Sequence, residues 1–244
     1  LTASGTVSVR ATNPVTLCTA LLTGTTALTV NPIPGVPAIT SPAGPVTQCV
    51  GSGTITLTSN TPANTNSWQW YKDGLAIVGA TGSSYVVADA VGSSGSYTVQ
   101  AIGITPTLCG SAQSVARVIT INALPLTTPA VGPATAEVCN GGTATITVTG
   151  SEAGVNYQLF IGATPVSGVV AGGGAINIVT NALTASGTVS VRATNPVTLC
   201  TTLLTGTTTL TVNPIPGVPA ITSPAGPVVQ CEGTGNVILT SDTP

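Results

Sequence analysis

Residues 67–74 read Ser-Trp-Gln-Trp-Tyr-Lys-Asp-Gly, a short aromatic run that ends at a turn signal. Residues 95–101 form a second run, Gly-Ser-Tyr-Thr-Val-Gln-Ala, and residues 115–121 form a third that is rich in β-branched side chains. These residue types favour strands, and turn-rich pieces such as residues 79–82 separate the runs. No long stretch has the 3.6-residue period of an amphipathic helix. The sequence therefore predicts an all-β chain.

A long internal repeat organises the sequence. Residues 1–62 recur almost unchanged as residues 183–244, with an offset of 182. Nine of the 62 positions differ, among them Val50, whose counterpart is Glu232. A repeat of this length and fidelity indicates a tandem array. We expect the sequence to be a window onto a longer one.

Proline-rich segments mark the junctions of this array, at residues 31–37, 122–125 and 213–219. They recur about every 91 residues, so the repeat is two domains long, and proline at this density favours short, semi-rigid connections. Several short strands in each interval predict two-sheet sandwiches standing end to end. We predict the C-terminal part of a domain in residues 1–32, complete domains in residues 33–122 and 123–213, and the N-terminal part of a domain in residues 214–244.

Two motifs in this chain resemble those of immunoglobulin-like domains. Trp70, in Trp-Tyr-Lys-Asp-Gly, and Tyr97, in Gly-Ser-Tyr-Thr-Val, stand where that family has a core tryptophan and a tyrosine corner. The resemblance implies an immunoglobulin-like sandwich with Trp70 and Tyr97 in its core. Leu159, the counterpart of Trp70, would occupy the core of the next domain. The family's inter-sheet cysteines would fall near Ser59 and Val99, and neither is a cysteine.

The larger pattern is a cysteine before a threonine-rich strand, a late cysteine, a closing strand and a proline-rich linker. It is similar to the tandem immunoglobulin-like and PKD-like repeats of giant secreted surface adhesins of the Bacteroidota, of the gliding-motility adhesin class. This resemblance implies export to the cell surface and a role as a stalk or filament. The implied partners are neighbouring repeats of the same protein.

Six cysteines recur with the domains, separated by 31, 60, 30, 61 and 31 positions. Regular cysteines without a Cys-x-x-Cys pair indicate disulfides of an oxidising compartment. The simplest connectivity joins Cys49 to Cys109 and Cys139 to Cys200, one bridge in each complete domain, and leaves Cys18 and Cys231 to pair outside the sequence. The alternative pairs cysteines across each linker, Cys18 with Cys49 and Cys109 with Cys139. The sequence leaves both open.

The composition excludes several classes of function. There is no histidine, and only four basic residues stand against six acidic ones. Without imidazole, the common nucleophilic and zinc-dependent active sites cannot be assembled, and no Asp-x-Asp spacing suggests a calcium site. Four basic residues cannot form the positive surface that nucleic acids require, and the apolar runs are too short to span a membrane. We expect no enzyme activity, no cofactor, no metal and no nucleic-acid partner.

The charge-poor repeat predicts a structural stalk or filament segment of an extracellular cell-surface adhesin, open to lateral self-association. The alternative is an adhesive module that binds a glycan or a surface through exposed loops and Trp68. We expect Trp68 to face away from Trp70, so that an exposed Trp68 could stack on a sugar ring; the interpretation that we favour is that Trp68 covers the sheet edge or packs on the neighbouring domain. Residues 170–175, a glycine-rich run without the lysine of a phosphate-binding loop, predict a flexible loop between strands.

Overall fold

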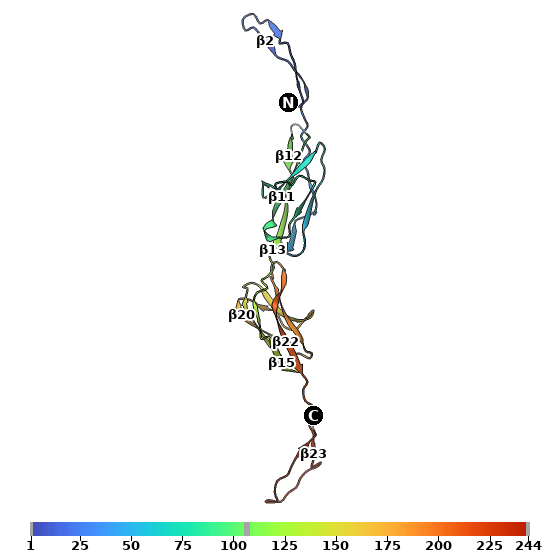
Figure 1. Cartoon of the computed structure of the whole chain (residues 1–244), viewed down its shortest axis with the longest axis vertical. Coiled ribbons are helices and arrows are strands. Elements are labelled where there is room, and N and C mark those ends of the chain that lie inside the picture. Colours follow the sequence, from blue (N-terminus) through green and yellow to red (C-terminus); the bar gives the residue numbers. More distant parts are fainter. Residues whose placement is uncertain (1, 105–107, 243–244) are drawn as a thin grey trace. The chain divides into compact units, whose positions relative to one another are not determined.

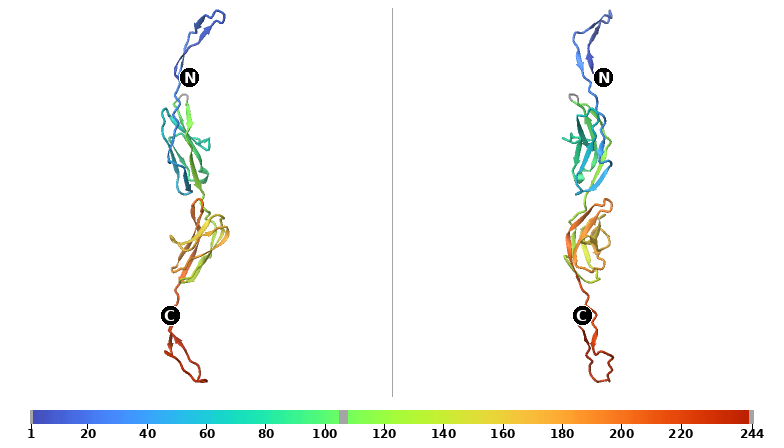
Figure 2. Two further views of the ribbon diagram at one scale, coloured as in Figure 1. Left: turned by 180° about the vertical axis from the view of Figure 1, so that it is seen from behind. Right: turned by 90° about the vertical axis from the view of Figure 1, so that its right-hand side faces the viewer.

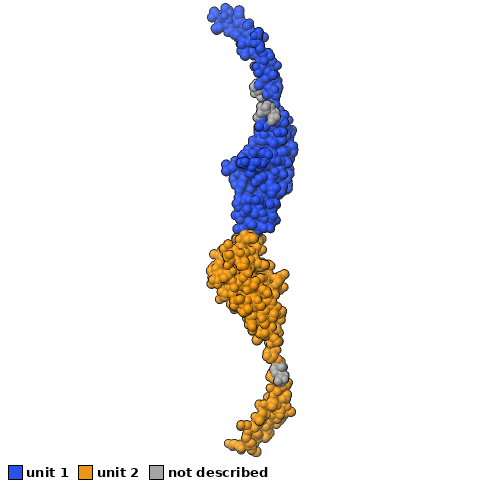
Figure 3. Space-filling model, in the orientation of Figure 1, with its two compact units in different colours: residues 1–123 blue, residues 124–244 orange. Residues whose placement is uncertain are grey.

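The structure is a computed structural model that describes residues 2–104 and 108–242. The chain divides into two compact units, Leu1–Ala123 and Leu124–Pro244, which Figure 3 colours blue and orange. Within the described residues the secondary structure is β, apart from one 3-10 turn, η1 (Val91–Ser93). Leu1 and residues 243–244, which begin and end the predicted terminal segments, lie outside the described residues.

The first unit contains one complete sandwich, which we call the first sandwich. Its strands are β5 (Ile39–Ser41), β6 (Val46–Cys49), β7 (Ile55–Ser59), β8 (Ser67–Lys72), β9 (Leu75–Ala76), β10 (Ser84–Val87), β11 (Gly95–Ile102), β12 (Gly110–Gln113) and β13 (Arg117–Asn122). One sheet has the order β10-β7-β5; the other has the order β6-β13-β11-β8-β9, with β12 paired to β11. Figure 1 labels β11, β12 and β13 of this sandwich. This is the two-sheet strand order of an immunoglobulin-like sandwich.

The second unit contains a second sandwich of the same plan. Its strands are β14 (Ala130–Gly132), β15 (Thr135–Cys139), β16 (Thr145–Ser151), β17 (Asn156–Ile161), β18 (Thr164–Pro165), β19 (Val170–Ala171), β20 (Gly174–Val179), β21 (Gly187–Thr194) and β22 (Thr201–Asn213). The sheets have the orders β14-β16-β20 and β15-β22-β21-β17-β18, with β19 paired to β17. The two views of Figure 2 show the two layers of each sandwich. The chain is therefore a tandem array of immunoglobulin-like sandwiches.

The core of the first sandwich is aromatic. Trp70 and Tyr97 are 0% and 2% exposed and pack with Leu57, Val99 and other buried aliphatic residues. The indole nitrogen of Trp70 donates a hydrogen bond to the carbonyl oxygen of Gly82 (2.9 Å), which satisfies its one polar atom inside the core. Both residues therefore lie where the resemblance to immunoglobulin-like domains places them.

Trp68 does not face away from Trp70, as we had expected. Side chains two positions apart on a strand lie on the same face, so Trp68 shares the face of Trp70 instead of opposing it. It is half-buried against the core of the first sandwich, and its indole nitrogen donates to the carbonyl oxygen of Asn60 (3.3 Å). Trp68 therefore completes the packing at the margin of the core.

The second sandwich fills the same space mostly with aliphatic side chains. Leu159, which stands in place of Trp70, is fully buried, and Val189 occupies the position of Tyr97. Tyr157, the counterpart of Trp68, is fully buried as well, and its hydroxyl oxygen accepts a hydrogen bond from the backbone nitrogen of Glu152 (2.9 Å). The aromatic side chain of this core thus sits two residues earlier on the strand than in the first sandwich.

The glycine-rich run of residues 170–175 is not a loose loop, as we had expected. It contributes the short strand β19 and the start of β20, and Gly172 between them packs closely against the second core. A side chain there would place its Cβ 2.3 Å from the carbonyl oxygen of Glu152 and 2.6 Å from Tyr157 Cε2. Glycine is required at this position because the backbone approaches its neighbours so closely.

The two ends of the described chain, residues 2–32 and 214–242, form only hairpins. The first four strands, β1 (Gly5–Val7), β2 (Arg10–Thr12), β3 (Thr19–Leu21) and β4 (Thr26–Leu28), pair as β1-β4 and β2-β3, and β23 (Ile221–Ser223) pairs with β24 (Thr240–Ser241). Val7 is 49% exposed, whereas Val189, the same residue of the repeat, is fully buried in the second sandwich. Burial of this segment therefore depends on the early strands of a complete sandwich.

In both sandwiches an early strand and the last strand run parallel. In the first, β6 pairs with β13, so that Val46 lies opposite Ile119 and Cys49 lies opposite Asn122. In the second, β15 pairs with β22, so that Cys139 lies opposite Asn213. We call the end where the chain enters a sandwich its proximal end, and the end where it leaves its distal end. Cys49 and Cys139 therefore lie at distal ends, beside the departing chain.

Candidate functional site

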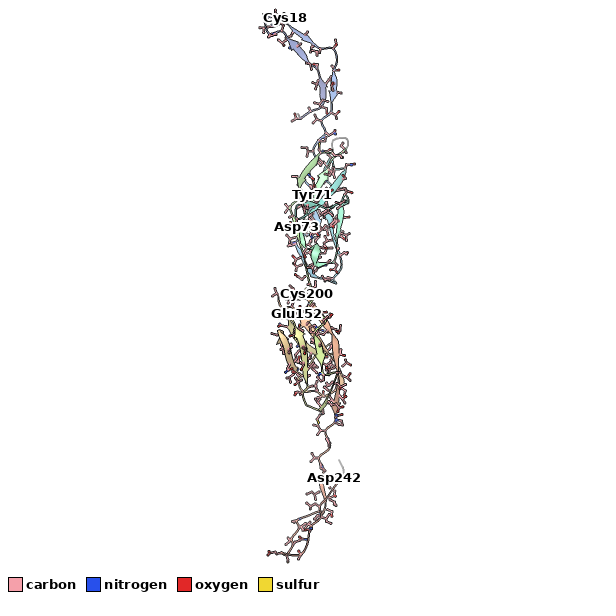
Figure 4. The ribbon with its side chains drawn as sticks, turned by 60° about the vertical axis from the view of Figure 1, so that its left-hand side comes forward. Cys18, Tyr71, Asp73, Glu152, Cys200 and Asp242 are labelled. Carbon is pink, nitrogen blue, oxygen red and sulfur yellow. The ribbon has the colours of Figure 1, made fainter. Side chains whose placement is uncertain are left out.

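The side chains in this chain with distinctive chemistry are the cysteines, and each complete sandwich carries one near each of its two ends. Cys49 is the last residue of β6 and Cys139 is the last residue of β15. We call these the distal cysteines. Cys109 and Cys200 each precede the strand that follows a hairpin loop, and we call them the hairpin cysteines. Figure 4 labels Cys18, the hairpin cysteine of the N-terminal repeat copy, at the tip of the hairpin formed by β2 and β3.

A tight turn follows each distal cysteine and holds it beside the last strand. In the first sandwich, Val50 N donates to Asn122 O (2.9 Å) and Ser52 N donates to Cys49 O (3.2 Å). The second sandwich repeats these bonds: Asn140 N donates to Asn213 O (2.8 Å), and Gly142 N donates to Cys139 O (2.8 Å). The turn contains a glycine at the same position in both sandwiches, with φ of 93° and 82°, a conformation that glycine adopts without strain.

A carboxylate further fixes the turn of the first sandwich. Asp89 Oδ2 accepts hydrogen bonds from the backbone nitrogens of Gly51 (2.9 Å) and Gly53 (2.8 Å). Bonds from an amide to a charged acceptor are stronger than neutral ones. The turn is therefore rigid, and it fixes the position of Cys49 on the sheet.

An asparagine shapes the hairpin that carries Cys200. Asn195 Oδ1 accepts hydrogen bonds from the backbone nitrogens of Val197 (2.9 Å) and Thr198 (3.1 Å), and Asn195 N donates to Cys200 O (2.9 Å). In such an Asx turn the side-chain oxygen takes the place of a backbone carbonyl oxygen as the acceptor. Asparagine suits this loop for that reason. The same bonds form around Asn13 in the N-terminal copy of the repeat.

A leucine in the left-handed conformation precedes every hairpin cysteine. The φ angles are 57° at Leu17, 46° at Leu108 and 60° at Leu199, values that non-glycine residues seldom adopt. In the hairpin of the second sandwich, Leu199 N donates to Asn195 O (2.8 Å) and so closes the loop. The residue before the hairpin cysteine therefore has the same left-handed backbone conformation in all three places.

The hairpin cysteines lie at the proximal ends. Gly103 N donates to Cys109 O (2.8 Å), and Gly103 lies beside the entering chain, because a Cβ there would meet Pro34 Cγ at 3.3 Å. In the second sandwich, Thr205 N donates to Thr127 O of the entering chain (3.2 Å). Cys200 precedes Thr205 by five residues, toward the hairpin tip.

The predicted disulfide within each sandwich is wrong, because its two cysteines lie at opposite ends. In the first sandwich the path along the sheet from Cys49 to Cys109 covers about eleven residues, or about 35 Å. In the second, the 13 residues of β22 separate Cys200 from Asn213, the neighbour of Cys139, a distance of about 40 Å. The Cα atoms of a disulfide lie at most about 7 Å apart.

The bonding state of the cysteines differs from both predicted connectivities. Cys49 and Cys200 are disulfide-bonded, whereas Cys18, Cys139 and Cys231 carry free thiols. The free thiol of Cys139 contradicts pairing with either Cys200 or Cys109, and the free thiol of Cys18 contradicts pairing with Cys49. The two bonded residues are a distal cysteine of one sandwich and a hairpin cysteine of the other.

The described residues offer little other chemistry. Residues 2–104 and 108–242 contain no group of three or more histidine, cysteine, aspartate or glutamate residues that could hold a metal ion. Burial, with smaller contributions from Tyr85 and Asp73, raises the pKa of Tyr97 to about 12, and burial also raises the pKa of Tyr157. Both tyrosines lie in sandwich cores, so these shifts reflect packing.

A hollow beside β17 and β18 is lined by aliphatic and threonine side chains, without any titratable group. It therefore lacks the acid, base or nucleophile that catalysis would need. In the part of the chain that the structure describes, we find no helix of the length and apolarity needed for a membrane crossing.

Comparison with known proteins gives structural similarity only. No family model matches the sequence, and no curated protein matches it. Among solved structures, three immunoglobulin domains of titin, in a Glu-to-Ala variant, are 17% identical, with 78% of this chain and 68% of that chain covered and a TM-score of 0.43. Fibronectin(III)-like modules of CbhA from Clostridium thermocellum are 13% identical, with 73% and 95% covered and a TM-score of 0.37.

The four N-terminal immunoglobulin domains of Dscam1 isoform 6.9 are 15% identical, with 84% of this chain covered and a TM-score of 0.35. The chain spans 54% of that fragment. These similarities carry no argument about function. The assignment of the fold rests on the sheet topology of each sandwich.

Proposed function

We propose that this chain is a load-bearing segment of an extracellular, repetitive cell-surface protein, as a stalk or filament segment of an adhesin would be. The observation that carries the proposal is the parallel pairing of an early strand with the last strand in both sandwiches. Tandem immunoglobulin-like domains suit a structural or adhesive extracellular role, and the disulfide-bonded cysteines suit an oxidising compartment.

Parallel pairing at this place resists tension. The chain enters each sandwich at one end and leaves at the other, so pulling on the chain draws β6 and β13, or β15 and β22, in opposite directions along their length. The hydrogen bonds between them are then loaded together in shear. A hairpin pulled open from its ends breaks the same bonds one at a time.

The surface of the protein also supports this proposal. Only ten of 244 residues are charged at neutral pH, so there is little electrostatic repulsion between neighbouring copies. The interactions that hold the sandwiches are apolar cores and backbone ladders, which depend weakly on salt. Such a protein keeps its strength when the ionic strength of its surroundings changes.

The glycan-binding alternative has less support than it had from the sequence. Trp68, the side chain proposed to stack on a sugar, is half-buried and donates its indole N–H to a backbone carbonyl. We therefore take mechanical connection as the function to test.

Single-molecule pulling on the whole chain tests the proposal. The chain is held by its two ends under reducing conditions, so that force passes through both sandwiches. Asn140 N faces β22, since it donates to Asn213 O, and alternation along the strand places Ala136 N on the same side and Glu137 N on the other. Ala136→Pro should therefore remove a bond of the loaded ladder, and Glu137→Pro is the matched control.

We expect the unmodified chain to give two rupture events at high force, one for each sandwich. Ala136→Pro should lower the force of one of them at least twofold, and Glu137→Pro should leave both nearly unchanged. Equal effects of the two variants, or rupture of the unmodified sandwiches at the low force of an opening hairpin, would contradict the load-bearing role.

A further inference from the structure

The last two strands of the second sandwich occur twice in this chain. Residues 184–213, which contain β21 and β22 and which we call the late hairpin, recur as residues 2–31, the N-terminal hairpin. Only two positions differ: Ala20 stands for Thr202 and Ala27 for Thr209. Thr202 is half-buried and Thr209 is exposed. Every buried side chain of the late hairpin is therefore present in the N-terminal hairpin.

The N-terminal hairpin already has the register of the late hairpin. Val7 lies opposite Thr26 in the N-terminal hairpin, and their counterparts Val189 and Thr208 lie opposite each other in the second sandwich. Register decides which side chains share a face of a sheet. The two hairpins therefore present the same side chains on the same face.

The face that the second sandwich buries is open in the N-terminal hairpin. Val9 is 58% exposed, whereas its counterpart Val191 is fully buried. Leu22 is 51% exposed, and its counterpart Leu204 is 4% exposed. The N-terminal hairpin thus carries an apolar face whose complementary surface is visible elsewhere in the same chain.

That complementary surface is made by the earlier strands of the second sandwich, in residues 124–182, which we call the acceptor. In its sheet, β22 pairs with β15 and β21 pairs with β17. Thr208 Oγ1 donates to Pro133 O (2.6 Å), and a Cβ at Gly206 would lie 2.9 Å from Val131 Cβ, so glycine permits this close approach. The N-terminal hairpin has the same hydroxyl and the same glycine, at Thr26 and Gly24.

We propose that the apolar face of the N-terminal hairpin is a docking surface for the acceptor of a second copy of this chain. The strands β15 and β17 of that copy hold the hairpin as they hold β21 and β22 of their own chain. Late hairpins are thus interchangeable between copies, wherever in the repeat the two copies stand. The inference concerns recognition between copies and does not depend on the load-bearing role.

The late hairpin of the same chain has two advantages over the hairpin of a second copy. Its attachment to the acceptor gives it an effective concentration of about millimolar. The N-terminal hairpin must also straighten on docking, because β3 and β4 are separate strands where the late hairpin has the continuous strand β22. Gly24 between them has a φ of 118°, whereas the φ of Gly206 is not positive. The unmodified chain should therefore be monomeric, and exchange should occur once the late hairpin is weakened.

Two substitutions separate donor from acceptor. Val9→Asp/Val191→Asp places a charge in the buried face of both hairpins, which leaves the acceptor open and removes the donor; this is the acceptor variant. The unmodified chain is the donor, and Val9→Asp alone is the disabled donor. Thr6→Asp is the matched control, because its counterpart Thr188 is exposed in the second sandwich and a charge on that face does not oppose docking.

The acceptor variant is refolded from denaturant together with each of the three donors and is then examined by size exclusion with light scattering. We expect a one-to-one complex with the unmodified chain and with Thr6→Asp. Binding of Val9→Asp should be at least about tenfold weaker, because docking would bury an unpaired carboxylate. Hydrogen exchange followed by mass spectrometry should show that residues 124–182 regain protection only in the complexes.

The proposal is overturned if the three donors bind equally, if no complex forms, or if a complex forms without protection of residues 124–182. Should the acceptor variant aggregate alone, solubility becomes the measurement: the unmodified chain and Thr6→Asp should keep it in solution, and equal aggregation with all three donors would overturn the proposal.

The single variant Val191→Asp tests whether the partner is a second copy. This chain has an intact donor and an open acceptor, so successive copies should join head to tail into oligomers that grow with concentration. A monomer with a protected acceptor would place the partner hairpin in the same chain and would refute docking between copies. A monomer with an unprotected acceptor would refute docking altogether.

Discussion

The hydroxyl of Tyr97 donates a hydrogen bond of 2.6 Å to the carbonyl oxygen of Ser93, four residues upstream. This bond ties strand β11 of the first sandwich to the turn that precedes it. Ser93 ends the 3-10 turn η1, and the ring of Tyr97 lies 6.0 Å from that of Tyr85 in the core. The tyrosine thus fixes a loop and fills the interior at the same time, the arrangement known as a tyrosine corner in immunoglobulin-like domains.

Removal of the Tyr97 hydroxyl should weaken the first sandwich. Tyr97→Phe keeps the packing but leaves the Ser93 carbonyl without its donor, and such a loss costs about 1 to 2 kcal/mol. Chemical denaturation followed by fluorescence of the two tryptophans, both of which lie in the first sandwich, measures this change. An unchanged denaturation midpoint would contradict a structural role for the bond.

The raised pKa of Tyr97 predicts a loss of stability at high pH. Its pKa is about 12 in the folded chain and 10.0 without the fold, so the folded state holds this proton more tightly. Titration of Tyr97 should leave the free energy of unfolding unchanged below about pH 10 and should lower it as the pH rises from about 10 to about 12. The difference between the unmodified chain and Tyr97→Phe, measured across this range, isolates the effect; a constant difference would contradict it.

Trp70 should not be replaceable by the leucine that its counterpart carries. Leu159 works in the second sandwich because Tyr157 fills adjoining space, whereas Trp70→Leu would leave a cavity and a carbonyl oxygen at Gly82 without its donor. We expect a loss of about 2 to 4 kcal/mol in the stability of the first sandwich. Leu75→Ala, at a position that is 76% exposed, is the control and should cost less than about 0.5 kcal/mol. Similar losses of stability from Trp70→Leu and Leu75→Ala would contradict the claim that Trp70 is needed to fill the core.

Two glycines of the second sandwich provide a matched test of close packing. Gly172→Ala would force the new Cβ against Glu152 and Tyr157, whereas Gly168 has open space and an unstrained φ. Gly172→Ala should lower the stability of the second sandwich by about 3 kcal/mol, and Gly168→Ala should leave it within about 0.5 kcal/mol. Thermal unfolding followed by circular dichroism measures both, and equal melting temperatures would refute the packing argument.

The sequence predicted the sandwiches because their determinants are local. Aromatic residues in residues 67–71, β-branched residues in residues 115–121 and turn residues between such runs favour strands and mark where they end. The resemblance to immunoglobulin-like domains placed Trp70 and Tyr97, because the motifs around them depend on few neighbours. Trp68 was misplaced for a simple geometric reason, since residues two apart share a face of a strand.

The cysteine pairing depends on where distant segments of the chain end, which spacing alone does not reveal. Two cysteines that are 60 residues apart in the sequence can be neighbours in the fold or can lie at opposite ends of a sheet. The signal that could have helped is the position of each cysteine in its strand. Cys49 ends a strand that runs parallel to the last one, and Cys109 precedes that last strand, so the two must lie at opposite ends.

In both sandwiches the last strand pairs with an early one, β13 with β6 and β22 with β15. This pairing has a consequence for biosynthesis, because a chain leaves the ribosome from its N-terminus. The early strand of each sandwich must wait for its partner until the last strand of that sandwich has been synthesised. Each domain of the array therefore completes its fold only after its whole length has emerged.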